Sequence, residues 1–371
     1  MIVTAVVQYS ILFLILLTLG LIFGAFDKMS PRSKKWYLLF SLGIFAFMTM
    51  FRDFSVGNDT LTYVTHFSEI ASASNPFVRI AKVTTEPGFV IYAWLLSRIT
   101  LDPRILFAVT GAIIYLCIGR FLNRYSEAPG YFVLVFFSLF AFNSYLSGVR
   151  QALSCAILLL AIDCILRGKR TKAMLLSLLA ASFHYSAFIF LALWLIITLT
   201  KKDQIQGFLL KLAAISIAVM FGFQPFLNLL LQIFPKYNYY VGDSYFDGQV
   251  RVATVATLSL CLILVVVPLF FKKNSTLISE NQNVEKFLSK MSWMAVFILA
   301  ISFFANILSR LGNIAYLCVY ALYSNNMCRL QKRDKYPITI LMLVLFYIYG
   351  AIVIIYRTPD WQTTFPYKFG L

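Results

Sequence analysis

A succession of long apolar runs constrains the fold of this chain more than any other feature of its sequence. A helix needs about 20 apolar residues to cross the hydrocarbon core of a bilayer. The runs that reach or approach this length are residues 3–26, 36–51, 105–122, 131–146, 149–166, 173–199, 208–234, 252–271, 291–308, 311–327 and 337–356. The pattern predicts an all-α, polytopic membrane helical bundle of about 10 to 12 membrane segments.

Composition excludes a water-soluble enzyme. Hydrophobic residues make up 60% and charged residues 13% of the chain, against roughly 45–50% and about 25% in soluble domains. The 36 Phe and 21 Tyr residues suit lipid-facing helices and interfacial aromatic belts. No segment resembles a separate soluble domain, so residues 1–371 are predicted to form a single polytopic domain. The first run has no basic segment before it and is too long for a signal peptide, so we expect it to be retained.

The basic residues predict the orientation. The formal net charge is +17, but most Lys and Arg residues lie in short clusters between apolar runs, which is how orientation is set in a membrane. Nucleic acid is therefore discarded as a partner. The clusters place the N-terminus outside and leave as outer loops residues 52–86, residues 235–251 and the tail after residue 356. The first two hold the longest polar stretches, so we expect an extracytoplasmic site.

Two stretches do not fit a simple alternation of spans. Residues 87–99 are too few to span comfortably and are predicted to form a half-helix that enters and returns from the outer side. Residues 173–199 lie between two basic clusters and are too few for two spans. They form either a re-entrant pair of half-helices broken near residues 182–185 or one long tilted helix. Non-helical backbone at membrane depth is tolerated only beside protein or a cavity.

Three arginines are predicted to bind an anion near the outer surface: Arg52, Arg150 and Arg310. Under the predicted topology they lie at outer ends of helices, as does Arg357, against the positive-inside bias. Ionisable groups in membrane segments usually face the bundle interior or a wet cavity. Because Arg binds phosphate bidentately and keeps its charge, the group predicts a site for a diphosphate-sized anion. For each single Arg, the alternative is a side chain that extends to the headgroup layer.

Short motifs flank these arginines. Gly57 permits a turn after Arg52, and Asn58 or Asp59 can cap an interfacial helix whose apolar face comprises Leu61, Val64, Phe67 and Ile70. Glu86 precedes a proline suited to the first helical position, so it is either a cap of the half-helix or a catalytic carboxylate.

Two further motifs lie deeper in the chain. Arg150 and Gln151 fall in the first turn of a helix after the small residues Ser147 and Gly148, and guanidinium and amide groups at a helix N-terminus form an anion site. His184 lies in the middle of an apolar run. It is either structural, or a general base or hydrogen-bonding contact to substrate.

No metal and no cofactor are predicted. The six cysteines are scattered singly in or beside apolar runs, without a Cys-x-x-Cys pair, and read as small core residues. The sequence also has no Asp-x-Asp motif and no Cys/His cluster. A metal-independent mechanism is therefore the default expectation.

Taken together, the motifs resemble those of the EpsG family of membrane polysaccharide-polymerase proteins, which is related to the Wzy-type O-antigen polymerases. The resemblance covers essentially the whole chain and rests on the order and spacing of Arg52, Val56-Gly57-Asn58-Asp59-Thr60, Tyr63, Glu86-Pro87-Gly88, Ser147-Gly148-Val149-Arg150-Gln151, Phe183-His184-Tyr185-Ser186, Ser309-Arg310 and Phe365-Pro366-Tyr367-Lys368. Asn58 is an insertion in the family's glycine-aspartate-threonine element.

The resemblance implies a glycosyltransferase of the bacterial inner membrane whose active site faces the periplasm. Such an enzyme transfers the growing O-antigen or exopolysaccharide from undecaprenyl diphosphate to a fresh repeat unit on the same lipid carrier. Arg52, Arg150 and Arg310 would stabilise the leaving diphosphate. The expected contacts to substrate are Gly57, Thr60, Tyr63, Gln151 and Tyr185. A chain-length regulator is the protein partner that the resemblance implies.

A base is needed for the acceptor hydroxyl, and the candidates are His184, Glu86 and Asp59. His184 and Glu86 rank first because Asp59 also has a capping role. This ranking is a hypothesis from residue type and position.

Other classes of function remain open. A ligase that moves finished glycan to another acceptor would use the same arginines. A lipid-oligosaccharide flippase or transporter would need a cationic pathway across the membrane, whereas residues 252–271 and 291–308 hold no charge. A membrane acyltransferase is disfavoured because no His paired with an acidic residue is evident. The Tyr-rich part of the loop 235–251 is either a sugar-binding rim or an aromatic belt.

Overall fold

The structure is a computed structural model that describes residues 1–80, 85–200, 204–233, 251–271, 282–303, 306–359 and 363–370. Within these ranges the chain is helical and has no β-strand beyond one isolated bridge. It forms two compact units, Met1–Ala187 with Ser324–Leu371, and Phe188–Tyr323. The predicted all-α class is confirmed. That the whole chain acts as a single membrane domain stays a prediction.

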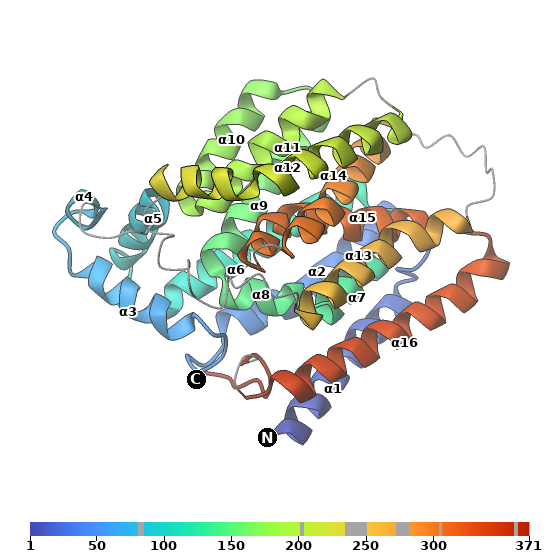
Figure 1. Ribbon diagram of the computed structural model, residues 1–371. Coiled ribbons are helices and arrows are strands. Elements are labelled where there is room, and N and C mark those ends of the chain that lie inside the picture. The colour runs from blue at the N-terminus through green and yellow to red at the C-terminus, as the bar shows by residue number, and fades with distance from the viewer. Residues whose placement is uncertain are drawn as a thin grey trace. The chain divides into compact units, whose positions relative to one another are not determined.

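The first unit contains most of the helices (Figure 1). They are α1 (Ile2–Ile22), α2 (Pro31–Met50), α3 (Thr60–Ala71), α4 (Pro76–Ile80), α5 (Pro87–Ser97), α6 (Arg104–Tyr125), α7 (Pro129–Ser138), α8 (Ala141–Ser147), α9 (Val149–Leu166), α10 (Arg170–Phe183), the 3-10 helix η1 (Tyr185–Ala187) and α16 (Lys332–Arg357). The second unit contains α11 (Phe188–Leu199), α12 (Ile205–Ile233), α13 (Val252–Phe270), α14 (Gln282–Ile301), the 3-10 helix η3 (Asn306–Gly312) and α15 (Asn313–Cys328), whose last residues, from Ser324, belong to the first unit.

This is a multi-pass membrane protein. In the described part of the chain, five helices are long and apolar enough to cross a bilayer, namely α1, α6, α9, α13 and α16. Their bounds confirm the corresponding apolar runs to within a few residues. The short helix predicted within residues 87–99 is also present, as the apolar helix α5. That it enters the membrane from the outer side and returns stays a prediction.

The apolar run 131–146, expected to be a single helix, is instead a bent pair. Helices α7 and α8 meet at 61°, and Phe140 between them has the left-handed backbone conformation, with φ of 62°. Neither Gly nor Pro marks this bend. After the bend, Phe142 stacks on Phe45 of α2 with ring centroids 4.7 Å apart. Aromatic packing of this kind has overridden a locally helical sequence, since propensity is a weak prior against tertiary contacts.

Small residues allow close packing within the first unit. Helix α9 packs against both α6 and α10. The buried residues of α10 are Ala173, Ser177, Ala180 and Ala181, and Ser154 of α9 donates a hydrogen bond of 2.9 Å to the carbonyl of Ala180. Small side chains and interhelical hydrogen bonds are the usual means of helix association in lipid, where burial of apolar surface gives little driving force.

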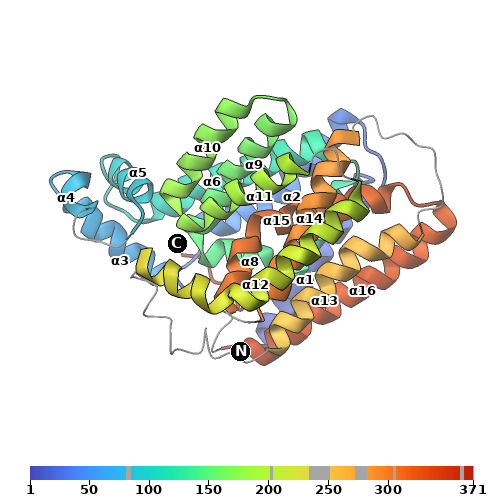
Figure 2. The same ribbon diagram turned by 45° about the horizontal axis from the view of Figure 1, so that its top comes forward.

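Helices α3, α4 and α5 lie together as a separate group of short helices, which both Figure 1 and Figure 2 show. The predicted helix after Asp59 is confirmed as α3, but its buried face is shifted, because Leu61 is exposed. The buried residues are Thr60, Tyr63, Phe67 and Ile70. The face has moved because α3 packs against α5, and Tyr63 and Phe67 join the core that α5 supplies.

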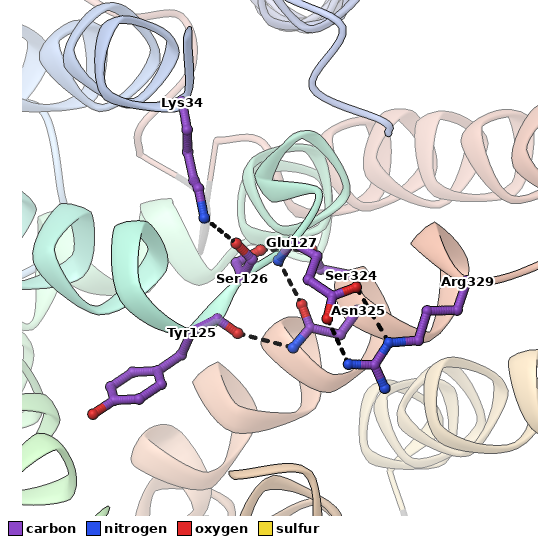
Figure 3. A network of polar contacts seen from close by, with 7 residues as sticks. All are labelled: Lys34, Tyr125, Ser126, Glu127, Ser324, Asn325 and Arg329. Atoms are coloured by element: carbon purple, nitrogen blue, oxygen red, sulfur yellow. Dashed lines mark hydrogen bonds and ion pairs between the residues drawn. The ribbon is translucent and has the colours of Figure 1, made fainter. Parts of the chain in front are cut away.

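A polar network ties the loop between α6 and α7 to the end of α15 (Figure 3). The side-chain oxygen of Asn325 accepts the backbone N–H of Glu127 at 2.8 Å, and its NH₂ group donates to the carbonyl of Tyr125, also at 2.8 Å. The Glu127 carboxylate accepts from Arg329 at 2.6 and 3.2 Å. Both backbone groups of the loop thus find partners, as buried polar groups in a membrane protein must.

Two more contacts fasten the same loop. Lys34, near the start of α2, donates to the carbonyl of Ser126 at 2.7 Å, and the hydroxyls of Ser126 and Ser324 are 2.8 Å apart. The residues in Figure 3 come from segments about 90 and 200 positions apart in the chain. The network therefore holds the C-terminal part of the first unit against its N-terminal part.

A second ionic cluster surrounds Asp163 on α9. Arg124 lies 2.5 Å from its carboxylate, the hydroxyl of Tyr125 donates to it at 2.7 Å, and Arg167 lies 3.7 Å away. Arg124 of α6 thus makes a shorter contact with Asp163 than Arg167 of the same helix end does. The cluster joins the ends of α6 and α9 on the side assigned to the cytoplasm.

Within the second unit, α14 packs against α11, α12, α13 and η3. Lys290 of α14 is buried; it donates to the carbonyl of Thr200 and lies over the ring of Phe208, 5.2 Å from its centroid. The predicted outer loop 235–251, with its Tyr-rich stretch, lies outside the described residues apart from its last residue.

Candidate functional site

The junction between α8 and α9, residues 146–151, contacts several of the sequence motifs of the first unit. The carbonyl oxygen of Leu146 accepts a hydrogen bond from Nη1 of Arg52. The hydroxyl oxygen of Ser147 accepts the backbone N–H of Asn58 at 3.2 Å. The loop after α2 is therefore fastened to the junction at two points, one through a side chain and one through the backbone.

Arg52 is a buried cation whose hydrogen-bonding capacity is only partly used. Its exposed fraction is 1%, and its guanidinium lies over the ring of Phe107, 4.1 Å from the centroid. Among the described residues, Nε and Nη2 of Arg52 have no hydrogen-bond partner. Burial lowers the pKa of Arg52 to about 10 because the interior penalises the charged form, yet the group stays positive at neutral pH. A buried cation with two unpaired donors favours an anionic ligand.

Gly57 shapes the loop that carries Arg52. Its φ is +92°, a conformation that glycine adopts without strain, and an added Cβ would lie 2.8 Å from both Leu146 Cδ2 and Thr60 Oγ1. The buried hydroxyl of Thr60 donates to the carbonyl of Val56 at 2.6 Å. Glycine is thus required where this loop approaches α8, and Thr60 closes the turn.

Asp59 occupies the N-cap position of α3, but its side chain makes no capping bond. The expected capping role of its carboxylate is therefore wrong, and the side chain is exposed. Asn58 does not cap the helix through the described contacts either; its side-chain oxygen accepts the hydroxyl of Thr363 at 2.5 Å. The carboxylate of Asp59 remains on the surface beside the loop.

The C-terminal tail returns to the same loop. Arg52 and Phe369 form an antiparallel backbone bridge, and the N–H of Asp53 donates to the carbonyl of Lys368 at 3.0 Å. The hydroxyl of Tyr367 donates to the last turn of α2. The tail motif therefore holds the backbone of Arg52 and Asp53 in place through hydrogen bonds.

Glu86 and Arg150 form an ion pair. Oε2 of Glu86 lies 2.5 Å from Nη1 of Arg150, and Oε1 of Glu86 accepts the backbone N–H of Tyr185 at 3.4 Å. The rings of Tyr63 and Phe89 each lie 5.8 Å from the Arg150 guanidinium. Glu86 occupies the N-cap position of α5 but does not cap it, so the capping interpretation is wrong. The carboxylate instead links α9 to the segment after α10.

The interruption predicted near residues 182–185 is confirmed. Helix α10 ends at Phe183, and His184 has extended backbone, with φ of −157° and ψ of 122°. At this point α5 approaches so closely that a Cβ on Gly88 would lie 2.8 Å from the carbonyl oxygen of Ser182. That the interruption makes a re-entrant membrane segment stays a prediction.

His184 is held by the turn that follows it. Its Nδ1 lies 2.7 Å from the hydroxyl oxygen of Ser186 and accepts the backbone N–H of Ser186 at 3.3 Å. The same hydroxyl oxygen accepts a hydrogen bond from the side-chain amide of Gln151 at 3.2 Å. The imidazole is thus connected to the first turn of α9, next to Arg150.

Nearly all of the residues singled out from the sequence lie on segments that contact the α8–α9 junction, residues 146–151, or one another. These residues are Arg52, Gly57, Asp59, Thr60, Tyr63, Glu86, Arg150, Gln151, His184 and Tyr185. Arg310 belongs to the second unit, where it is exposed on η3. The catalytic and binding roles assigned to all of these residues stay predictions.

Four contributions to this region were not predicted from the sequence. Phe107 lies within a uniformly apolar run, so nothing marked it as the ring beneath Arg52. A main-chain carbonyl, such as that of Leu146, has no sequence signal at all. Ser186 and the tail were part of quoted motifs and received no role, although a polar residue two positions after a mid-membrane His is a usable signal.

Among the described residues, no three His, Cys, Asp or Glu side chains are grouped so as to hold a metal ion. The expectation of a metal-independent mechanism stays a prediction.

The chain was compared with families of known proteins, with curated proteins and with solved structures. The model of the EpsG family matches residues 35–369, a range that includes every motif described above. Neither the curated proteins nor the solved structures gave a match.

Proposed function

The chain belongs to the EpsG family, and from this we propose that it is a membrane glycosyltransferase that polymerises a bacterial surface polysaccharide, an O-antigen or exopolysaccharide. In the proposed reaction, a hydroxyl of a new lipid-linked repeat unit forms a glycosidic bond with the anomeric carbon of the growing glycan. The bond from that carbon to the lipid diphosphate breaks. The hydroxyl proton is released, and undecaprenyl diphosphate leaves with its negative charge.

The single observation that carries this proposal is the state of Arg52. A diphosphate leaving group accumulates negative charge as the glycosidic bond to it breaks, and pre-positioned cations stabilise that charge in the transition state. Arg52 supplies a buried guanidinium with two unpaired donor nitrogens, Nε and Nη2, and no need to reorganise. Such a cation is costly in the protein alone, so it is best explained by a ligand that compensates it.

Arg150 has a different electrostatic state and, we infer, a different role. Glu86 already neutralises it at 2.5 Å, so it attracts an anion less strongly than Arg52 does. Its Nε atom is buried without a hydrogen-bond partner among the described residues. Arg150 is therefore proposed to donate a directed hydrogen bond to substrate. Binding of the diphosphate by Arg310 stays a proposal from the sequence alone.

The proposed setting is the periplasmic face of the inner membrane. The positive-inside distribution of Lys and Arg supports it, because the loop with Arg52 falls on the opposite side from the Lys34, Arg124 and Arg329 clusters. The donor and the acceptor are both undecaprenyl-diphosphate-linked oligosaccharides in this proposal, and a chain-length regulator is the expected protein partner.

The test is complementation of a deletion strain with variants at matched membrane levels, followed by separation of the surface glycan by chain length. Deletion is expected to leave acceptor with one repeat unit, and Arg52→Ala and Arg150→Ala are expected not to restore the ladder. Arg104→Ala is the control, since Arg104 also lies over an aromatic ring, Phe54 at 5.0 Å, but is exposed and pairs locally with Asp102.

Two results would overturn the proposal. Glycan that accumulates on the lipid carrier without attachment would indicate a ligase. A ladder that survives deletion would remove the polymerase role altogether.

A further inference from the structure

Gln8 is a polar residue in the second turn of the apolar helix α1. A polar side chain in a membrane segment is costly unless its hydrogen bonds are satisfied. Nε2 of Gln8 donates to the carbonyl of Tyr367 at 3.2 Å, and Oε1 of Gln8 accepts the backbone N–H of Tyr367 at 2.5 Å. The side-chain amide therefore pairs with the backbone of the C-terminal tail, residues 363–370, as a residue of a neighbouring β-strand would.

The tail that Gln8 holds runs along the loop that carries Arg52 (Figure 1). Three backbone hydrogen bonds of 3.0 to 3.3 Å join the tail to this loop, from the N–H of Asp53 to Lys368, from the N–H of Gly370 to Phe51 and from the N–H of Gly57 to Thr363. The tail thus contacts the loop on both sides of Arg52.

Tyr367 connects Gln8 to the end of α2. Its backbone pairs with Gln8, whereas its buried side chain donates a hydrogen bond to the carbonyl of Met48, in the last turn of α2. Further along the tail, a Cβ on Gly370 would lie 2.9 Å from the carbonyl oxygen of Arg52. A displacement of the tail at Tyr367 would therefore be transmitted to the backbone of Arg52.

The side chain of Arg52 depends on that backbone for its position. Among the described residues, its guanidinium has one hydrogen bond, from Nη1 to Leu146, while Nε and Nη2 have no partner. A charge stabilises a transition state most effectively when it is held in place before the substrate binds.

We propose that Gln8 is a positioning residue for Arg52, which acts through the tail to place the guanidinium for its anionic ligand. That the ligand is a lipid diphosphate rests on the proposed function. The path from Gln8 to Arg52 rests on the contacts alone.

The first experiment measures amide hydrogen exchange of residues 51–58 by mass spectrometry, with the full-length protein in lipid nanodiscs. Gln8→Met keeps the length of the side chain, suits an apolar helix and removes both hydrogen-bonding groups. We expect faster exchange of residues 51–58 in this variant. Tyr367→Phe, which removes the next link of the path, is expected to have the same effect. Unchanged exchange of residues 51–58 in Gln8→Met would overturn the proposal.

The matched control is Ser10→Ala, two residues further along α1. The hydroxyl of Ser10 donates to the carbonyl of Val6 at 2.7 Å and lies 2.8 Å from the hydroxyl of Tyr347 on α16. Its removal disturbs the packing of α1 without removing a described contact to the tail, so exchange of residues 51–58 is expected to stay as in the unaltered protein. Equal acceleration by Ser10→Ala and Gln8→Met would show a general loss of packing and overturn the positioning role.

The second experiment asks whether Gln8 acts through Arg52. The affinity for undecaprenyl diphosphate is measured in the unaltered protein, Gln8→Met, Arg52→Ala and the double variant. We expect Gln8→Met to weaken binding roughly 10-fold, the effect of one hydrogen bond to a charged group, and to have little further effect in Arg52→Ala. A double-mutant cycle of this kind isolates the coupling between two residues. An equal loss of affinity in both backgrounds would show that Gln8 does not act through Arg52.

The two experiments also separate this inference from the function on which it rests. If deletion leaves the glycan ladder unchanged, the proposed function fails, and the exchange of residues 51–58 still decides whether Gln8 holds the Arg52 loop. If deletion abolishes the ladder but the cycle shows no coupling between Gln8 and Arg52, the function stands and the positioning role fails.

Discussion

Oε2 of Glu86 and Nη1 of Arg150 lie 2.5 Å apart, with only 4% and 26% of the two side chains exposed. The pair joins the start of α5 to the first turn of α9, and the second oxygen of Glu86 reaches the backbone after α10. Three segments that are far apart in sequence thus depend on one carboxylate. Its loss affects both the fold and the charge of the site.

Removal of Glu86 alone is expected to destabilise the protein strongly. In Glu86→Ala, Arg150 is left buried without its counter-charge, and breaking a buried pair from one side costs about 3–5 kcal/mol. The double variant Glu86→Ala/Arg150→Ala is expected to be more stable than Glu86→Ala, since it leaves no unpaired charge. Thermal unfolding in detergent measures both.

The matched control for this pair is Glu69→Ala. Glu69 pairs with Arg79, but with 45% of the Glu69 side chain exposed, and exposed pairs contribute only about 0–1 kcal/mol. If Glu69→Ala and Glu86→Ala lower the melting temperature equally, the Glu86–Arg150 pair is not the buried clamp described above.

Arg52 is expected to couple stability to anion binding. Its folded pKa of about 10 lies below the ordinary value of 12.5, so below pH 10 both the folded and unfolded states carry the proton and the desolvation penalty is fully present. The penalty is relieved only as the pH rises from about 10 toward 12.5. At neutral pH, relief must come from a bound anion instead.

Undecaprenyl diphosphate is therefore expected to raise the melting temperature of the unaltered protein more than that of Arg52→Ala, by linkage of binding to folding. Arg52→Lys keeps a charge but cannot bond Leu146 and an anion through one planar group, so transfer is expected to fall at least about 10-fold. Arg104→Lys is the exposed counterpart. Equal stabilisation of the unaltered protein and Arg52→Ala by the lipid would exclude Arg52 from the anion site.

Loss of a contact in the network of Figure 3 is expected to lower the stability of the protein and to leave the candidate site unchanged. Asn325→Ala leaves the N–H of Glu127 and the carbonyl of Tyr125 without their partner, and each unsatisfied buried group costs about 1–3 kcal/mol. Asn325→Asp keeps the acceptor and loses the donor, so it should fall between Ala and Asn. An Asp variant no more stable than the Ala variant would mean that the N–H of Glu127 does not depend on this side chain.

Much of this fold could be predicted from periodicity and length. The apolar runs predicted the helices because side chains at membrane depth face either lipid or a packed interior, and both are apolar. The break at His184 was predicted because its run is too long for one span and too short for two. The bend at Phe140 could not be predicted. It is produced by aromatic contacts between α8 and α2, and no local residue encodes it.

The residues of the candidate site could be predicted from the sequence. Which of its arginines is paired with a carboxylate could not. Arg52 and Arg150 were indistinguishable in the sequence, both cations at helix ends beside small polar residues. In the structure one is neutralised by Glu86 and the other lies on the Phe107 ring without a described acidic partner. Which carboxylate pairs with which guanidinium depends on how α5 packs against α9 and α10, and such long-range contacts leave no local signal.

Gly57 offers the sharpest test of the loop geometry because the chain supplies a matched glycine. Gly57 and Gly24 both have positive φ, of +92° and +64°, but a Cβ on Gly57 would meet Leu146 and Thr60 at 2.8 Å, whereas nothing lies within 4 Å of one on Gly24. Both Ala variants carry backbone strain of about 1–2 kcal/mol. Only Gly57→Ala is expected to push the Arg52 loop away from α8 and abolish the glycan ladder while the protein still reaches the membrane. Equal activity of Gly57→Ala and Gly24→Ala would show that the close approach of this loop to Leu146 is dispensable.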